Sequence, residues 1–204
     1  MGFWAVIPVK PLRRGKSRLA DVLSEDERTL LNYSMLENTL KVLSSLQELE
    51  SIMVVSRDPS ALVLAREYGA RTVQEDGSPD LNTALKRATL VAQAYVTKSL
   101  IIVPADLPLL SKEDILAMIN ETGSPPEMII APDLRRDGTN CLLISPPGPI
   151  QYAYGPGSFN RHLVQAQRYG YRTAVILRQG LQLDLDLPED LDLLKTLSMD
   201  ETSH

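Results

Sequence analysis

The chain has 204 residues, a net charge of −5 and a hydrophobic share of 44%, which suits one globular domain with a core of its own. The acidic balance argues against general nucleic-acid binding, which needs a broad basic surface. One cysteine and two histidines exclude an internal disulfide and argue against a zinc cluster. No apolar run approaches the roughly 20 residues that cross a bilayer, and the N-terminus lacks a signal-peptide pattern. We therefore expect a cytoplasmic single domain over 1–204, with no membrane partner.

Strands and helices alternate along the sequence. Strands are expected at 3–7, 52–55, 72–73 (weaker), 100–103, 128–131, 141–144 and 173–177, and helices at about 24–46, 59–69, 81–96, 111 onward, 158–169 and 188 onward. This order predicts a single-domain, three-layer α/β/α fold with a mostly parallel, twisted sheet. Such sheets bind ligands at the carboxyl ends of their strands, which points to the loops after 3–7 and 100–103.

The segment after the first strand is strongly basic. Within nine residues it carries Lys10, Arg13, Arg14, Lys16 and Arg18. Fixed cations and free backbone N–H groups at this place suit a polyphosphate, and a solvated surface loop is the alternative. The segment contains neither a P-loop nor a Gly-x-Gly-x-x-Gly fingerprint. Lys16 is the first candidate for a phosphate contact, followed by Arg18 and Lys10.

Carboxylates follow the central strand and precede the terminal helix. Asp106, just past 100–103, is placed to hold Mg²⁺, although an Asp at this point also suits a simple turn. Asp184 and Asp186 fall on one face if 183–186 is extended, and close carboxylates repel unless a cation offsets their charge. One of them could complete a metal site with Asp106. Alternatively, Asp186 only begins the terminal helix, whose first turn contains Glu189 and Asp190.

Three further polar segments are candidates for ligand contacts. Asn82 lies at a helix start, where it either reads a base or ribose or caps the helix. The segment 137–140 is typical of a hairpin turn. Gly155 and Gly157 directly precede a helix, whose free N–H groups could bind a phosphate or carboxylate. Cys141 lies in a predicted strand and is expected to be a core residue.

Taken together, these segments resemble the 2-phospho-L-lactate guanylyltransferases of deazaflavin coenzyme biosynthesis. That family belongs to the nucleotidyltransferases with a glycosyltransferase-A-like (nucleotide-diphospho-sugar transferase) fold. The resemblance spans almost the whole chain and rests on Lys-Pro-Leu at 10–12, Gly-Lys-Ser-Arg-Leu at 15–19, Leu-Asn-Thr-Ala-Leu at 81–85, Pro-Ala-Asp-Leu-Pro at 104–108, Asp-Gly-Thr-Asn at 137–140, Gly-Pro-Gly-Ser-Phe at 155–159 and Asp-Leu-Asp at 184–186. The family often has glycine where this chain has Asp80, a difference that bears on base selectivity.

The resemblance implies transfer of GMP from GTP to 2-phospho-L-lactate with release of pyrophosphate. Relatives use phosphoenolpyruvate or 3-phosphoglycerate. It also implies a homodimer, a nucleotide-binding half at about 1–110 and an acceptor-binding half at about 111–204. The implied site residues are Lys16, Arg18 and Asp106 for catalysis; Lys10, Lys16, Arg18, Asn82 and Asp106 for the nucleotide; Thr139, Gly155 and Ser158 for the acceptor; and Asp106 and Asp186 for Mg²⁺.

Three alternatives to this function remain open from the sequence. A molybdenum-cofactor guanylyltransferase shares the Asp-x-Pro feature, but its Gly-Gly-rich loop after the first strand is missing here. A sugar-nucleotide transferase is disfavoured for the same reason. A catalytically silent nucleotide-binding protein would keep the fold, although the retained carboxylates and cations argue against it.

Overall fold

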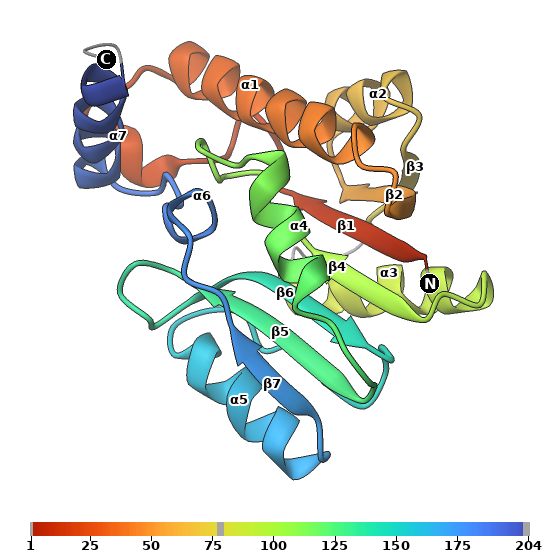
Figure 1. Cartoon of the computed structure of the whole chain (residues 1–204). Coiled ribbons are helices and arrows are strands. Elements are labelled where there is room, and N and C mark those ends of the chain that lie inside the picture. Colours follow the sequence, from red (N-terminus) through yellow and green to blue (C-terminus); the bar gives the residue numbers. More distant parts are fainter. Residues whose placement is uncertain (1, 77–79, 202–204) are drawn as a thin grey trace.

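The computed structural model describes residues 2–76 and 80–201 (Figure 1). The strands are β1 (Phe3–Val9), β2 (Leu49–Ser56), β3 (Arg71–Gln74), β4 (Ser99–Ile102), β5 (Glu127–Pro132), β6 (Thr139–Ser145) and β7 (Arg172–Val175). The helices are the 3₁₀ turn η1 (Ser17–Leu19), α1 (Glu25–Ser44), α2 (Pro59–Glu67), α3 (Leu81–Ala94), α4 (Lys112–Asn120), α5 (Ser158–Arg168), α6 (Gln179–Gln182) and α7 (Pro188–Glu201). Part of the predicted polar loop at 75–80 lies outside the described residues.

Within the described residues, seven strands form one sheet in the order β3-β2-β1-β4-β6-β5-β7. The strands β3, β2, β1 and β4 are parallel, and β5 pairs in parallel with β7. Strand β6 runs antiparallel to both β4 and β5. The mostly parallel sheet and the α/β fold class are thus confirmed.

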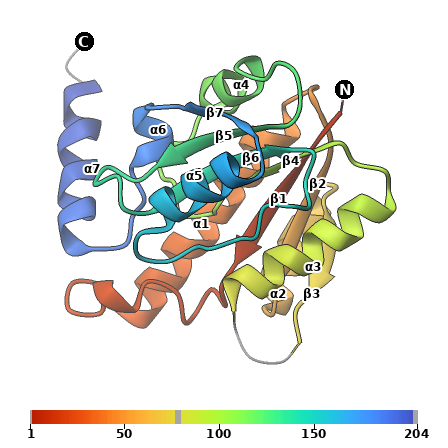
Figure 2. The same ribbon diagram turned by 90° about the horizontal axis from the view of Figure 1, so that it is seen from below.

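Alternating side chains divide the interior into two cores, one on each face of the sheet. From β1, Ala5 and Ile7 point into the first core, while Trp4 and Val6 point into the second. Helices α1, α2, α4 and α6 contribute to the first core, whereas α3 and α5 cover the opposite face (Figures 1 and 2). This three-layer arrangement leaves the strand ends available for a site.

Local signals in the sequence account for several element boundaries. Ser24 and Glu27 form the capping box that begins α1, satisfying amide groups that would otherwise lack partners. Gly69, with φ of 73°, follows the last residues of α2, as its freedom from a Cβ permits.

Three boundaries differ from the sequence-based expectation. Thr139 and Asn140 are the first residues of β6 rather than part of a hairpin turn. Residues 183–186 are irregular rather than extended strand. The helix α6 was not expected, because four residues are too few to show a helical period.

In the part of the chain that the structure describes, no helix combines the length and apolar character required to span a membrane.

Candidate active site

A cavity of about 400 Å³ opens at the carboxyl ends of β1, β2, β3 and β4. Its lining includes three cations of the basic loop (Lys10, Arg14 and Lys16), Arg57 after β2, Glu75 after β3, Asp80 before α3, Asp106 after β4, and Asp186. The cavity therefore brings together Lys10, Lys16, Asp106 and Asp186 from the predicted site residues. The other predicted residues do not line it: Asn82 lies in the first turn of α3, Thr139 begins β6, Gly155 lies in the loop before α5, and Ser158 begins α5.

The basic loop is held in place from two sides. The Leu12 amide donates to Asp58 Oδ2 at 2.7 Å, and Asn32 Nδ2 of α1 donates to the Leu12 carbonyl at 2.7 Å. Gly15 packs so closely on Asn32 that a Cβ at this position would lie 2.6 Å from Asn32 Nδ2. The loop is thus tied to the middle of α1 and to the N-cap of α2, which fixes the positions from which its cations extend.

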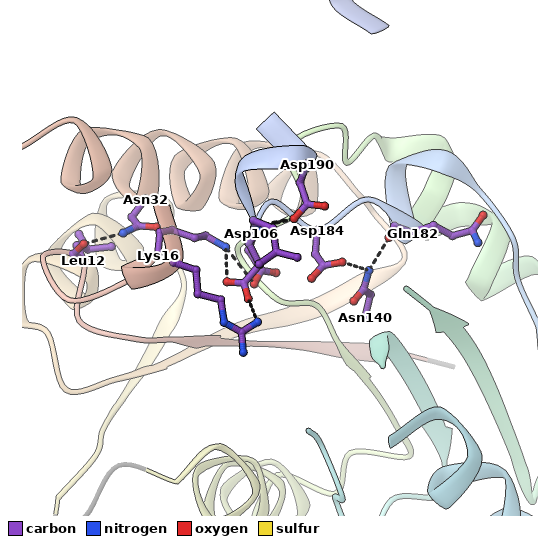
Figure 3. Close-up of polar contacts among 11 residues, drawn as sticks. Leu12, Lys16, Asn32, Asp106, Asn140, Gln182, Asp184 and Asp190 are labelled. Carbon is purple, nitrogen blue, oxygen red and sulfur yellow. Dashed lines mark hydrogen bonds and ion pairs between the residues drawn. The ribbon is translucent and has the colours of Figure 1, made fainter. Parts of the chain in front are cut away.

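Lys16 is the most constrained residue of this loop. Its backbone is left-handed, with φ of 58°, a conformation that side chains other than glycine adopt at a cost of about 1–2 kcal/mol. Its side chain is only 6% exposed, and Nζ lies 3.4 Å from Asp106 Oδ2 and 4.0 Å from Asp186 Oδ1 (Figure 3). Backbone strain at a buried ammonium group is typical of a functional site.

Arg18 lies at the rim of the same cluster. Its Nη1 is 3.0 Å from Asp186 Oδ2, and its side chain is largely exposed. Arg13 is exposed and does not line the cavity, whereas Lys10 and Arg14 do. The basic loop is therefore divided: three cations face the cavity, Arg18 pairs at its edge, and Arg13 faces solvent.

Both terminal-segment carboxylates approach Asp106, although their segment is not a strand. The Leu185 amide donates to the Asp106 carbonyl at 3.0 Å, which places Asp184 and Asp186 beside the β4 loop. Burial, reinforced by the nearby charge of Asp106, raises the pKa of Asp184 to about 6. Asn140 Nδ2 donates to Asp184 Oδ1 at 3.4 Å and also to the carbonyls of Leu181 and Gln182 (Figure 3).

The start of the terminal helix is served by another carboxylate. Asp190 Oδ2 accepts from the amides of Asp186 and Leu187 at 2.9 and 2.6 Å. Because Asp190 supplies these acceptors, the Asp186 side chain faces Lys16 and Arg18. Asp186 thus lies at the start of the terminal helix, as the helix-start interpretation predicts, but its carboxylate faces the cavity.

The donor set fits Mg²⁺, which binds proteins through one or two carboxylates and completes its shell with waters and substrate phosphates. Carboxylate oxygens of Asp106 and Asp186 both lie within 4.0 Å of Lys16 Nζ, so the two carboxylates face the same positive charge. Over residues 2–76 and 80–201, no group of three or more His, Cys, Asp or Glu side chains is arranged to hold a metal by itself. A metal at this place would have the carboxylates of Asp106 and Asp186 as its protein ligands, with Asp184 next to them.

A second loop, at 153–157, is held by three side chains from two helices, α3 and α5. Asn82 on α3 accepts from the Tyr154 amide at 2.8 Å and donates to the Tyr154 carbonyl at 3.4 Å. His162 on α5 accepts from the Ala153 amide at 3.1 Å. Arg161 donates to the carbonyls of Ala153, Gly155 and Pro156.

The capping interpretation of Asn82 is wrong. Asp80 is the N-cap of α3, because its Oδ1 accepts from the Thr83 amide at 2.6 Å. The Asn82 carboxamide is engaged with the backbone of Tyr154, so Asn82 connects the start of α3 to the 153–157 loop.

Backbone amides at the start of α5 already have hydrogen-bond partners within the protein. Asp137 accepts from the Gly157 amide through Oδ2 at 3.0 Å and from the Phe159 amide through its carbonyl at 3.1 Å, while the Ser158 amide donates to Gly155 O. The expectation that these amides are free for an anion is therefore wrong for residues 157–159. The Ser158 hydroxyl is different: it is buried and has no hydrogen-bond partner in the described part of the chain.

Other cavity residues were not identified from the sequence. Arg57 and Glu75 follow β2 and β3 and line the cavity at the end away from Asp106. Their positions at strand ends were the available signal, but both segments look like ordinary polar loops. Cys141 is fully buried, and burial raises the pKa of its thiol, so its expected role in the core is confirmed.

The sequence matches a known protein family over almost its whole length. The sequence profile described as "Guanylyl transferase CofC like" matches residues 3–202. The chain belongs to the CofC-like guanylyl transferase family. The expected family is confirmed, as is nucleotidyl transfer as the class of reaction.

Relatives of this CofC-like protein carry two different acceptor names. A phosphoenolpyruvate guanylyltransferase from Rubrobacter xylanophilus is 41% identical over 195 residues, covering 96% of this chain and 94% of that protein. A 2-phospho-L-lactate guanylyltransferase from Methanocaldococcus infernus is 36% identical over 186 residues, covering 91% and 81%.

Solved structures share the fold at low identity. A nucleotidyl transferase from Methanothermobacter thermautotrophicus superposes with a TM-score of 0.67 at 16% identity, covering 98% of this chain and 99% of that one. A structure assigned to the nucleotide-diphospho-sugar transferases, from Desulfovibrio desulfuricans, has a TM-score of 0.77 at 16% identity and covers 95% and 87%. The expected nucleotide-diphospho-sugar transferase fold is confirmed.

Proposed function

We propose that this protein transfers GMP from GTP to the phosphate group of a phosphorylated three-carbon acid and releases pyrophosphate. The observation that carries the proposal is the position of Lys16 between Asp106 and Asp186, in a cavity that Lys10 and Arg14 also line. Cations that offset phosphate charge and carboxylates that suit a metal thus face one space. Nucleotidyl transfer depends on this combination of positioning and electrostatic stabilisation.

The order of charges along the cavity supports one orientation of the nucleotide. Asp106 and Asp186 lie at the β4 end, the basic loop lies in the middle, and Glu75 lies at the β3 end. Strands are about 4.8 Å apart, so β3 and β4 are separated by about 14 Å. We infer that the α-phosphate lies near Lys16 and the guanine base lies toward Glu75, whose carboxylate can accept from the guanine N1–H and amino groups.

Two acceptors differ only in the carbon skeleton beside the same carboxylate and phosphate. The sequence-based expectation was 2-phospho-L-lactate, and the relative from Methanocaldococcus infernus carries that name. The relative from Rubrobacter xylanophilus, at 41% identity, is named for phosphoenolpyruvate. We place phosphoenolpyruvate first for this reason, 2-phospho-L-lactate second and 3-phosphoglycerate third. Thr139, Gly155 and Ser158 are the proposed acceptor contacts.

The reaction then needs no strong general base, because the acceptor phosphate is already ionised. Its oxygen forms a bond to the α-phosphorus of GTP, and the bond to the bridging oxygen of the β-phosphate breaks, so pyrophosphate leaves with that electron pair. Lys16, Lys10 and Arg14 offset the charge of the reacting anions, while the 153–157 loop orients the acceptor. Mg²⁺ held by Asp106 and Asp186 would supply further charge neutralisation on the phosphates.

The test is a matrix of nucleotides and acceptors. Purified protein is incubated with each of GTP, ATP, CTP and UTP against phosphoenolpyruvate, 2-phospho-L-lactate and 3-phosphoglycerate, with and without Mg²⁺. We expect pyrophosphate release and a guanylylated acid, identified by mass, with GTP and Mg²⁺. Absence of turnover with every pair would favour a catalytically silent nucleotide-binding protein.

A further inference from the structure

His162 is a fully buried imidazole with a hydrogen bond at each ring nitrogen. Nδ1 lies 2.9 Å from Thr139 Oγ1, and Nε2 lies 3.1 Å from the Ala153 amide nitrogen. The ring of Tyr154 packs edge-on against it, with centroids 5.3 Å apart. Burial, with a contribution from the charge of Arg161, lowers the pKa of His162 to about 4. The imidazole is therefore neutral at ordinary pH and carries a single ring proton.

The position of that proton follows from the two partners. A backbone amide can only donate, so Nε2 must be the acceptor, and the proton must lie on Nδ1. Nδ1–H therefore donates to Thr139 Oγ1. Among the described residues, His162 is the hydrogen-bond partner of the Thr139 side chain, so the Thr139 O–H hydrogen is left for a group outside the protein.

Thr139 does not stand alone in this respect. Ser158 and His162 are four residues apart on α5 and so share one face of the helix. Ser158 is only 1% exposed, and its hydroxyl has no hydrogen-bond partner within residues 2–76 and 80–201. Two hydroxyl donors thus remain unsatisfied beside the 153–157 loop. Buried polar groups normally have partners, so a ligand that only accepts hydrogen bonds, such as a carboxylate or phosphate, suits this place.

We propose that His162 is a positioning residue that fixes the Thr139 hydroxyl as a hydrogen-bond donor toward an anionic group of the acceptor. With the opposite tautomer, Thr139 would donate to His162 and present only lone pairs to an anion. The Ala153 amide prevents that state, so the donor is set before the acceptor arrives and needs no reorganisation. The inference rests on the proposed function, since that function supplies the anionic acceptor.

Two substitutions of His162 separate its two hydrogen bonds. In His162→Asn, the amide nitrogen can occupy the place of Nδ1 and still donate to Thr139. In His162→Gln, the amide oxygen can reach the place of Nε2 and accept from Ala153, but the bond to Thr139 is lost. Thr139→Val removes the hydroxyl at nearly constant shape, and Thr139→Ser retains it.

The experiment measures KM for the acceptor and for GTP separately, with the melting temperature of each variant. We expect Thr139→Val to raise the acceptor KM about tenfold or more, the loss expected for one hydrogen bond to a charged group. His162→Gln should raise the acceptor KM severalfold. His162→Asn and Thr139→Ser, which retain the donor, should raise it less than His162→Gln and Thr139→Val, respectively. The double variant Thr139→Val with His162→Gln should be no worse than Thr139→Val alone, because residues that act through one contact are non-additive. KM for GTP should not change.

Three results would overturn the inference: an unchanged acceptor KM in Thr139→Val, additive losses in the double variant, or equal rises of both KM values that follow the melting temperature. The tautomer is also read without turnover, from the ¹⁵N chemical shifts of the His162 ring. A proton on Nε2 would refute the inference even in an inactive protein. Absence of turnover by the wild type with the proton on Nδ1 would instead refute the proposed function.

Discussion

At the scale of single residues, the site depends on one ammonium group whose backbone is strained and whose side chain is buried. Lys16→Met keeps the side-chain length and the left-handed backbone but removes the charge. If Lys16 makes one charged hydrogen bond to the nucleotide, its loss should cost roughly 1.5–3 kcal/mol of binding free energy. We expect the Kd for GTP, measured by calorimetry, to rise by about tenfold or more. Arg13→Met removes a cation of the same loop that faces solvent, and an equal loss there would show that only the net charge matters.

The two carboxylates beside Lys16 make a second prediction at this scale. Asp106→Asn and Asp186→Asn remove charge with little change in shape, so both variants should fold while losing Mg²⁺-dependent pyrophosphate release. The measurement is the initial rate against Mg²⁺ concentration, with circular dichroism as the check on folding. Asp192→Asn, at a side chain 78% exposed on α7, is the matched control. Full activity of both site variants would remove the metal assignment.

At the scale of elements, the basic loop depends on close packing between Gly15 and α1. A Cβ at Gly15 would lie 2.6 Å from Asn32 Nδ2, the atom that also donates to the Leu12 carbonyl. Gly15→Ala should therefore displace Asn32 and loosen the loop, at a cost of about 1–3 kcal/mol in the free energy of unfolding. Denaturant unfolding measures this loss, and the Kd for GTP should rise with it. Gly123→Ala is the control, because a Cβ there has only contacts at 3.8 Å or more.

The same scale shows what the sequence could and could not predict. Long elements with periodic apolar residues and capping residues, such as α1, were predicted close to their bounds. The four-residue helix α6 and the irregular course of 183–186 were not, because neither leaves a periodic pattern. The grouping of Lys16 with Asp106 could be predicted, since both follow central strands of a parallel sheet. The support of the 153–157 loop could not. Asn82 lies 72 residues from Tyr154, and Arg161 and His162, five to nine residues from their partners, contact an irregular loop that leaves no periodic pattern.

At the scale of the whole molecule, distant segments of the chain meet around the cavity. In both orientations of the fold, α7 lies beside the segment that leads from β1 to α1 (Figures 1 and 2), consistent with the pairing of Arg18 with Asp186. Both ends of the sequence thus contribute charges to one site. The homodimer implied by the family resemblance stays a prediction, which light scattering coupled to gel filtration would test.

The free energy of unfolding should depend on pH through the ionisation of Asp184. The pKa of this carboxyl in the folded protein is about 6, above its ordinary value of 3.8, chiefly because of burial and then because of Asp106. Between these two values the folded state binds a proton that the unfolded state has released, so the free energy of unfolding falls as pH rises through this window. About two pKa units correspond to about 3 kcal/mol, lost in full above pH 6.

Asp184→Asn removes the titrating group, so it should not show this loss. Relative to wild type, the variant should gain about 2.4 kcal/mol in the free energy of unfolding between pH 4 and pH 7.5, as measured by urea denaturation without divalent ions. Asp192→Asn should show no such pH-dependent difference, since its side chain is exposed. Mg²⁺ should raise the melting temperature of wild type at pH 7.5 more than that of Asp184→Asn, because a bound cation relieves the repulsion between Asp184 and Asp106. A difference between wild type and Asp184→Asn that stays constant over this pH range would show that Asp184 keeps an ordinary pKa.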